Sequence, residues 1–146
     1  MRIAIANDHA GHDLKVALAA RAQALGHTVV DLGPAEAGPV DYPIYAHRVA
    51  RQVATGAVDR GVLVCGTGIG MSIAANRHRG VRAALCHDAF TAEAARRHND
   101  ANVLCLGGRT TAVAVALQIL DIFLATDFEG GRHERRVQRI ETEEEP

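Results

Sequence analysis

The sequence predicts a three-layer α/β protein in which a doubly wound, five-stranded parallel sheet lies between two layers of helices. Short apolar runs alternate with longer, helix-compatible segments from the first residues onward, and this alternation is typical of parallel sheets with helical crossovers. A glycine-rich loop follows the third apolar run, where such sheets bind ligands. The 146 residues contain no internal repeat and no linker, so we expect a single domain, 1–146.

Five segments have the length and apolar character of buried strands. Turn residues or a helix end stand beside each run; Gly26, for example, ends the first helix just before the second strand. The expected strands are Arg2–Asn7, Thr28–Leu32, Gly61–Cys65, Val81–Cys86 and Ala101–Leu106.

Helical segments fill the intervals between these strands. The first helix places Leu14, Leu18 and Leu25 near one face. The segment Thr110–Leu124 is apolar on most faces and is expected to be well buried. The acidic end, 141–146, is expected to fray. The expected helices are His12–Leu25, Ile44–Ala54, the segment from the glycine loop to Asn76, Phe90–Arg97, Thr110–Leu124 and a basic tail, Arg132–Ile140. Together these elements predict a Rossmann-like domain with a C-terminal helical tail.

The composition argues against several classes of partner. A net charge of −1 does not favour nucleic acid or an anionic membrane, and the few aromatic residues offer no stacking platform for single strands. The longest apolar stretch, Thr111–Thr126, is interrupted by polar residues and too short to span a bilayer. Three cysteines without short spacing, and no signal-peptide pattern, lead us to expect a cytoplasmic protein.

The loop after the third strand combines a thiol with three glycines at alternate positions, Gly66, Gly68 and Gly70. Backbone N–H groups in such a loop, followed by the start of a helix, form a site for an anion. Cys65 ends the strand beside this site, where positive potential favours the thiolate. A base that faces an oxyanion hole is a catalytic arrangement. A tight turn alone would explain one of the glycines easily and all three poorly.

Two further groups follow strands, Asp8-His9 and Gly107–Arg109. Doubly wound sheets bind ligands at the carboxyl ends of their strands, so we expect these residues beside the glycine loop. His98-Asn99, in contrast, precedes a strand and belongs at the opposite end of the sheet. If this pair takes part in catalysis, it must serve the site of another subunit, which indicates a dimer.

Other interpretations of these residues are weaker. The glycine spacing departs from the dinucleotide-binding fingerprint, whose third glycine stands one position later. Asp8, His9 and His12 suggest a metal, yet no further cluster has ligand spacing. Cys86 and Cys105 lie inside apolar runs and are expected in the core.

The arginines of the C-terminal tail allow two interpretations. A run of charges usually forms a solvated helix face or docks on a partner subunit. Arg132 and Arg136, however, stand four positions apart on one face and can grip a phosphate between two guanidinium groups. The two glycines before them would let the tail swing across to another site.

Several motifs, in order, resemble the B-type ribose-5-phosphate isomerases, which share a superfamily with galactose-6-phosphate isomerase. The resemblance covers nearly the whole chain and is carried by Asn7–Gly11, Asp41–Pro43, Cys65–Ser72, Ala74–Asn76, Arg97–Val103 and Glu129–His133. It implies a cytoplasmic isomerase of the pentose phosphate pathway. Such an enzyme interconverts ribose 5-phosphate and ribulose 5-phosphate through a cis-enediolate, without a metal or an organic cofactor.

The resemblance also implies catalytic roles. Cys65 is the base that moves a proton between C1 and C2. His98 protonates the ring oxygen to open the furanose, with Asp8 as a hydrogen-bonding partner, and Thr67 lies in the catalytic loop. Met71 stands where some related proteins carry a glutamate base, which leaves Cys65 as the base. The implied substrate-binding residues are Asp8, His9, Gly66, Thr67, Gly68, Ile69, Gly70, Asn99, Arg109, Arg132 and Arg136.

The implied assembly is a homodimer, or a tetramer of the same kind, with each site built from two chains. Two alternatives for function stay open at the level of sequence. Allose or galactose 6-phosphate has one extra carbon, which is a small discrimination problem. A non-catalytic sensor of sugar phosphates or nucleotides would use the same anion loop, although binding alone does not require a thiol.

Overall fold

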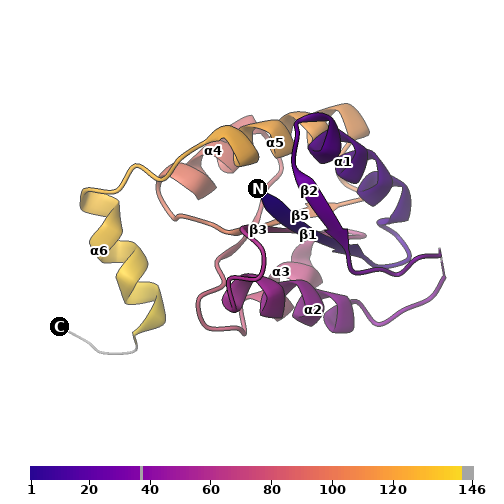
Figure 1. Cartoon of the computed structure of the whole chain (residues 1–146), viewed down its shortest axis with the longest axis horizontal. Coiled ribbons are helices and arrows are strands. Elements are labelled where there is room, and N and C mark those ends of the chain that lie inside the picture. Colours follow the sequence, from indigo (N-terminus) through magenta and orange to yellow (C-terminus); the bar gives the residue numbers. More distant parts are fainter. Residues whose placement is uncertain (37, 143–146) are drawn as a thin grey trace.

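The computed structural model describes residues 1–36 and 38–142 and confirms the predicted α/β architecture. Five parallel strands form one sheet in the order β2-β1-β3-β5-β4 (Figure 1). The strands are β1 (Arg2–Asn7), β2 (Thr28–Asp31), β3 (Arg60–Cys65), β4 (Ala83–Leu85) and β5 (Val103–Gly107). The helices are α1 (His12–Ala24), α2 (Tyr42–Ala54), α3 (Ile69–Ala75), α4 (Ala89–Arg97), α5 (Val113–Ala125), α6 (Arg132–Gln138) and the 3-10 turn η1 (Arg139–Glu141).

Helices cover both faces of the sheet. Figure 1 shows α1, α4 and α5 on one side and α2 and α3 on the other. Alternate residues of each strand therefore enter different cores. On β1, Ile3 and Ile5 pack with the first group of helices, and Ala4 and Ala6 pack with the second. This alternation explains why the central strands read as continuous apolar runs: both of their faces are buried.

The three central strands end at the same level. Asn7 pairs with Val64 across β1 and β3, and Cys65 pairs with Gly107 across β3 and β5. As a result, the turns that follow β1, β3 and β5 lie along one edge of the sheet, as the sequence predicts.

Helix α5 differs from the prediction at its start and in its burial. It begins at Val113 because the amides of Thr110 and Thr111 donate to the Gly107 carbonyl and form a turn before it. It is not buried all round: Val113 and Val115 are exposed. Only its inner face, with Ala116, Ile119, Leu120 and Phe123, is buried in the core. Within the described residues, no helix is both long and apolar enough to cross a membrane.

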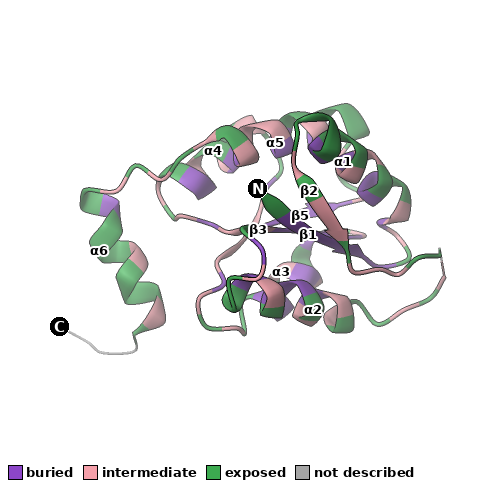
Figure 2. Cartoon of the chain, viewed as in Figure 1, coloured by how far each residue is buried: buried purple, intermediate pink, exposed green. Residues whose placement is uncertain are grey.

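Helix α6 stands apart from the three layers (Figure 1). Figure 2 shows it as largely exposed, in contrast to the purple strands at the centre of the sheet, and His133 is its one buried residue. The chain beyond it returns to the body, where the Gly80 amide donates to Glu141 Oε1 at 2.9 Å. Glu141 is thus held in place, although we predicted fraying from this residue on; residues 143–146 lie outside the described part of the chain.

Candidate active site

The turns after β1, β3 and β5 are joined by backbone hydrogen bonds. The Asp8 amide donates to the Val64 carbonyl at 3.0 Å, and the Gly108 amide donates to the Cys65 carbonyl at 2.7 Å. The Arg109 amide donates to the Gly66 carbonyl at 3.0 Å. The structure therefore brings together three of the predicted groups: the turn at Asp8, the glycine loop and the turn at Arg109.

Cys65 is held at the end of β3 with its thiol directed into the glycine loop. The residue is 5% exposed, and the Gly68 amide donates to its Sγ atom at 3.0 Å. The predicted placement of the thiol against the glycine loop is confirmed, and its role as a base stays a prediction.

The glycine loop offers several backbone donors that nothing else uses. The amides of Gly66, Thr67 and Gly70 donate no hydrogen bond within residues 1–36 and 38–142. Gly68 adopts a φ of +79°, and a Cβ atom there would lie 2.5 Å from Leu85 Cδ1, so a side chain does not fit. The resulting loop is a cradle of N–H groups beside the thiol, suited to an oxyanion.

Three polar side chains lie around this cradle: Asp8, His9 and Arg109. Asp8 is buried, and its Oδ1 accepts the Ala10 amide at 2.8 Å. His9 is exposed in the same turn and lines a cavity of about 370 Å³ between the starts of α1 and α5. The Arg109 side chain lies against Gly66, with Nη1 3.7 Å from the position that a Cβ would take. The positive charge of Arg109 thus lies beside the glycine loop.

His98 and Asn99 lie at the other end of the sheet, after α4 and before β5. A strand rises about 3.3 Å per residue, so the five residues of β5 put roughly 15 Å between these side chains and the glycine loop. The structure therefore does not bring His98 to Cys65, nor to Asp8, which the resemblance implies as its partner. The structure thus confirms that His98 and the glycine loop lie at opposite ends of the sheet.

A second group of functional side chains surrounds His98. Its ring stacks on the ring of His133, with centroids 4.5 Å apart and an angle of 15° between the planes. Arg132 Nε donates to His133 Nε2 at 3.3 Å. Helix α6 thus carries Arg132 and Arg136, both exposed, beside the histidine that precedes β5. The chain thus carries two separate groups of candidate residues, which we call the half-sites: the glycine-loop half and the half around His98.

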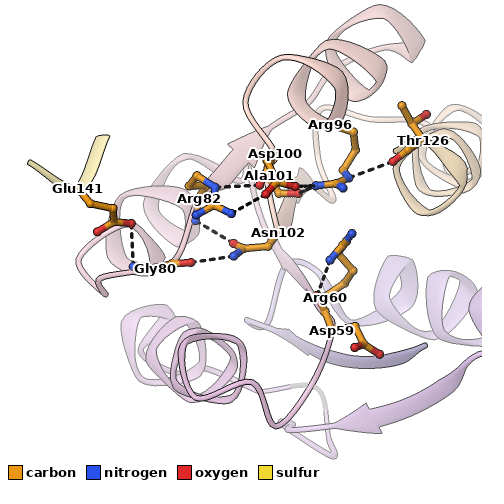
Figure 3. A network of polar contacts seen from close by, with 10 residues as sticks. All are labelled: Asp59, Arg60, Gly80, Arg82, Arg96, Asp100, Ala101, Asn102, Thr126 and Glu141. Atoms are coloured by element: carbon orange, nitrogen blue, oxygen red, sulfur yellow. Dashed lines mark hydrogen bonds and ion pairs between the residues drawn. The ribbon is translucent and has the colours of Figure 1, made fainter. Parts of the chain in front are cut away.

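The loop that carries His98 and Asn99 is fixed by a network of arginines (Figure 3). Asp100, which has a φ of +45°, accepts from Arg82 at 3.0 Å and from the buried Arg96 at 2.8 Å. Arg96 also donates to the carbonyls of Ala101 and Thr126. These contacts tie the loop to α4 and to the segment that leads into α6.

A group of three potential metal ligands includes His98 and is separate from the Asp8-His9-His12 group in the sequence. Ligand atoms of His98, Glu129 and His133 are all within 4.8 Å of one another. Arg132, however, already donates to His133 Nε2, and Arg97 Nε lies 3.3 Å from Glu129 Oε2. Two guanidinium groups therefore compete with a cation for His133 Nε2 and for one oxygen of Glu129.

The other two cysteines are core residues, as predicted. Cys86 is 1% exposed and Cys105 is fully buried. Burial raises the pKa of the Cys86 thiol to about 11 and raises the pKa of Cys105 as well. Both thiols therefore stay protonated and unreactive near neutral pH.

Two residues near the half-sites received no role from the sequence. The ring of Tyr42 packs on Gly70, where a Cβ would lie 2.7 Å from the ring carbon Cε2, and His133 stacks on His98. Both belong to segments that carry the family resemblance, Asp41–Pro43 and Glu129–His133. Spacing alone gave no signal for either, because each makes its contact with a residue distant in the chain.

The fold and the glycine loop define a class of protein: a doubly wound α/β protein with a loop of backbone amides beside a buried thiol. A model of the Ribose/Galactose Isomerase family matches residues 3–140, and the chain belongs to this family. Ribose-5-phosphate isomerase B of Escherichia coli (strain K12) is 45% identical over 139 residues, which cover 95% of this chain and 93% of that protein.

Solved structures agree with this assignment. Ribose-5-phosphate isomerase B of Clostridium thermocellum is 45% identical, with a TM-score of 0.95 over 97% of this chain and 95% of that chain. Ribose-5-phosphate isomerase B of Mycoplasma genitalium, with bound ribulose 5-phosphate, is 44% identical, with a TM-score of 0.93 over 96% of this chain and 93% of that chain.

Proposed function

We propose that this protein is a ribose-5-phosphate isomerase that interconverts ribose 5-phosphate and ribulose 5-phosphate. The observation that carries the proposal is the Cys65 thiol, which accepts the Gly68 amide at 3.0 Å beside free amides of the same loop. An aldose–ketose isomerisation needs this pair of groups: a base to move a proton and donors to stabilise the oxyanion. The relatives described above are named for this substrate.

In the proposed mechanism Cys65 removes the proton from C2 of the open-chain aldose. The electrons pass to the carbonyl oxygen, and a cis-enediolate forms. The amides of Gly66, Thr67, Gly68, Ile69 and Gly70 border the site where this charge develops. Transfer of the hydroxyl proton from O2 to O1 and return of the carbon-bound proton from Cys65 to C1 then give the ketose. Preorganised donors of this kind typically contribute about a hundredfold or more each to the rate.

The half around His98 supplies ring opening and phosphate binding from a second subunit. His98 protonates the furanose ring oxygen, Asn99 donates to the enediolate, and Arg132 and Arg136 grip the phosphate together with His9 and Arg109 of the first chain. The separation of the two half-sites within one chain supports this assignment, because the groups can meet only across an interface. In this arrangement Asp8 becomes the hydrogen-bonding partner of the other chain's His98.

Exposed apolar residues near both half-sites support a homodimer. Ile69 and Ile73 on α3 are 52% and 58% exposed, and Phe90 on α4 is 75% exposed. Phe90 and His98 line one shallow groove on α4. Contact with a second copy would cover this surface and give α6 the neighbour that its own chain does not provide.

The test is turnover of ribose 5-phosphate by the purified protein in excess EDTA, beside Cys65→Ala and, as a control, Cys86→Ala. We expect activity in wild type and control and a loss of at least about a thousandfold in Cys65→Ala. Activity that survives in Cys65→Ala would reject the thiol as base. If ribose 5-phosphate is not converted, the same assay with allose and galactose 6-phosphates distinguishes a hexose isomerase from a sensor that only binds.

A further inference from the structure

His133 lies between two residues of the proposed active site. It is 6% exposed, in the first turn of α6. One face of its ring covers the ring of His98, and its Nε2 atom accepts from Arg132 Nε at 3.3 Å. His133 therefore contacts both the proposed proton donor and one of the proposed phosphate ligands.

These contacts determine which form of the imidazole is present. A guanidinium N–H can only donate, so His133 Nε2 must accept, and the proton of the ring sits on Nδ1. Burial, followed by the positive charges of His98 and Arg132, lowers the pKa of His133. Geometry and charge agree that His133 is neutral at neutral pH, whereas its stacked neighbour His98 is half-buried and reaches solvent.

The charged groups around the stack oppose one another: the Glu129 carboxylate favours a protonated His133, whereas the neighbouring cations favour the neutral ring. Glu129 Oε1 is 3.9 Å from His133 Nε2, and Arg97 Nε lies 3.3 Å from the other oxygen of Glu129. Arg132 and Arg136 add positive charge from α6. An imidazolium at His133 would lie beside these cations. A neutral His133 ring presents its π face to His98, an arrangement that stabilises His98 when it carries the proton that it donates.

We propose that His133 is a positioning residue that holds His98 as a proton donor and Arg132 as a phosphate ligand in one preorganised unit. The stack fixes the plane of the His98 ring. The bond to Nε2 fixes Arg132 and leaves its two terminal nitrogens for the phosphate. This inference rests on the proposed function, and it adds a residue to which neither the sequence nor the family resemblance gave a role.

Two substitutions separate the two contacts. His133→Gln keeps an oxygen acceptor for Arg132 but removes the stacked ring. We expect kcat for ribose 5-phosphate to fall roughly tenfold to a hundredfold with little change in KM. His133→Phe keeps a stacked ring but removes the acceptor, so we expect KM to rise and kcat to change by less than about threefold. His27→Gln, in the turn before β2, is the control and should behave as wild type.

A third measurement distinguishes positioning from general damage to the fold. Ribulose 5-phosphate is an open-chain ketose, so exchange of its C1 hydrogen in D2O needs Cys65 but no ring opening. His133→Gln should retain this exchange, followed by NMR, within about threefold of wild type. If His133→Gln slows exchange as much as isomerisation, or slows neither, the inference is wrong.

The tautomer can be tested without turnover. In ¹⁵N-labelled wild-type protein the His133 ring should be neutral at pH 7, with its proton on Nδ1. A doubly protonated His133 at that pH overturns the inference even in a fully active enzyme. Absence of any ribose 5-phosphate turnover with a neutral His133 would instead count against the proposed function.

Discussion

At the scale of single residues, the environment of each thiol decides which one can react. Cys86 and Cys105 lie among apolar side chains, which oppose the charged thiolate. Cys65 is also buried, but a backbone amide points at its sulfur. From the sequence, only their positions distinguish a reactive cysteine from core cysteines. Cys65 ends a strand at a glycine loop, whereas the other two lie inside apolar runs. The N–H···S bond gives that distinction a physical cause.

This difference predicts which of the three thiols an alkylating reagent modifies. Because the pKa of Cys86 is raised to about 11, this thiol stays protonated below about pH 9, and Cys105 behaves likewise. We expect iodoacetamide at neutral pH to add one group, at Cys65, and to abolish activity. Peptide mass spectrometry locates the adduct, and ribose 5-phosphate should protect it. Equal labelling of all three cysteines, or inactivation that substrate does not slow, contradicts this view of the site.

At the scale of elements, the α4–β5 loop depends on charge pairs rather than on apolar burial. Asp100 receives Arg82 and Arg96 (Figure 3), and the Arg96 side chain is only 3% exposed. Removing the carboxylate would leave a buried guanidinium without its counter-charge, and such groups are costly to desolvate. The conformation of the loop that presents His98 and Asn99 therefore depends on these ion pairs.

Asp100→Asn tests the network with little change in shape, since asparagine also tolerates the positive φ of this position. We expect the free energy of unfolding to fall by about 2 kcal/mol, because one member of a largely buried pair is lost. The exposed pair of Glu93 and Arg97 is the matched control, and Glu93→Gln should change the free energy of unfolding little, because solvent screens this pair. Urea unfolding measures both. Equal effects would show that the network adds no more than a surface pair.

The same comparison explains what could be predicted for these elements. Apolar periodicity placed all five strands and the helices, because burial of a face repeats along the chain. The start of α5 was misplaced, because the turn at Thr110 and Thr111 depends on hydrogen bonds to Gly107. The roles of Arg82, Arg96 and His133 were not foreseen either. Each is defined by partners in other elements, which a single sequence without its fold does not reveal.

At the scale of the whole molecule, the sheet separates the proposed catalytic groups. The base and the anion loop follow the carboxyl ends of β1, β3 and β5, whereas His98 and α6 lie at the amino end of β5. Helix α6 is largely exposed (Figure 2) and makes few contacts with its own chain. A single chain thus holds all the groups of the proposed mechanism but cannot bring them together.

Complementation between two inactive variants tests whether sites are shared. In a dimer of Cys65→Ala with His98→Ala, one site carries both substitutions and the other carries neither. Random exchange makes about half of the dimers mixed, with one intact site each, so we expect about one quarter of wild-type activity in an equal mixture. Each variant alone should stay inactive. Exchange is verified first with differently tagged subunits. Verified mixed dimers without recovered activity would place base and acid in the same chain, which the geometry of β5 opposes.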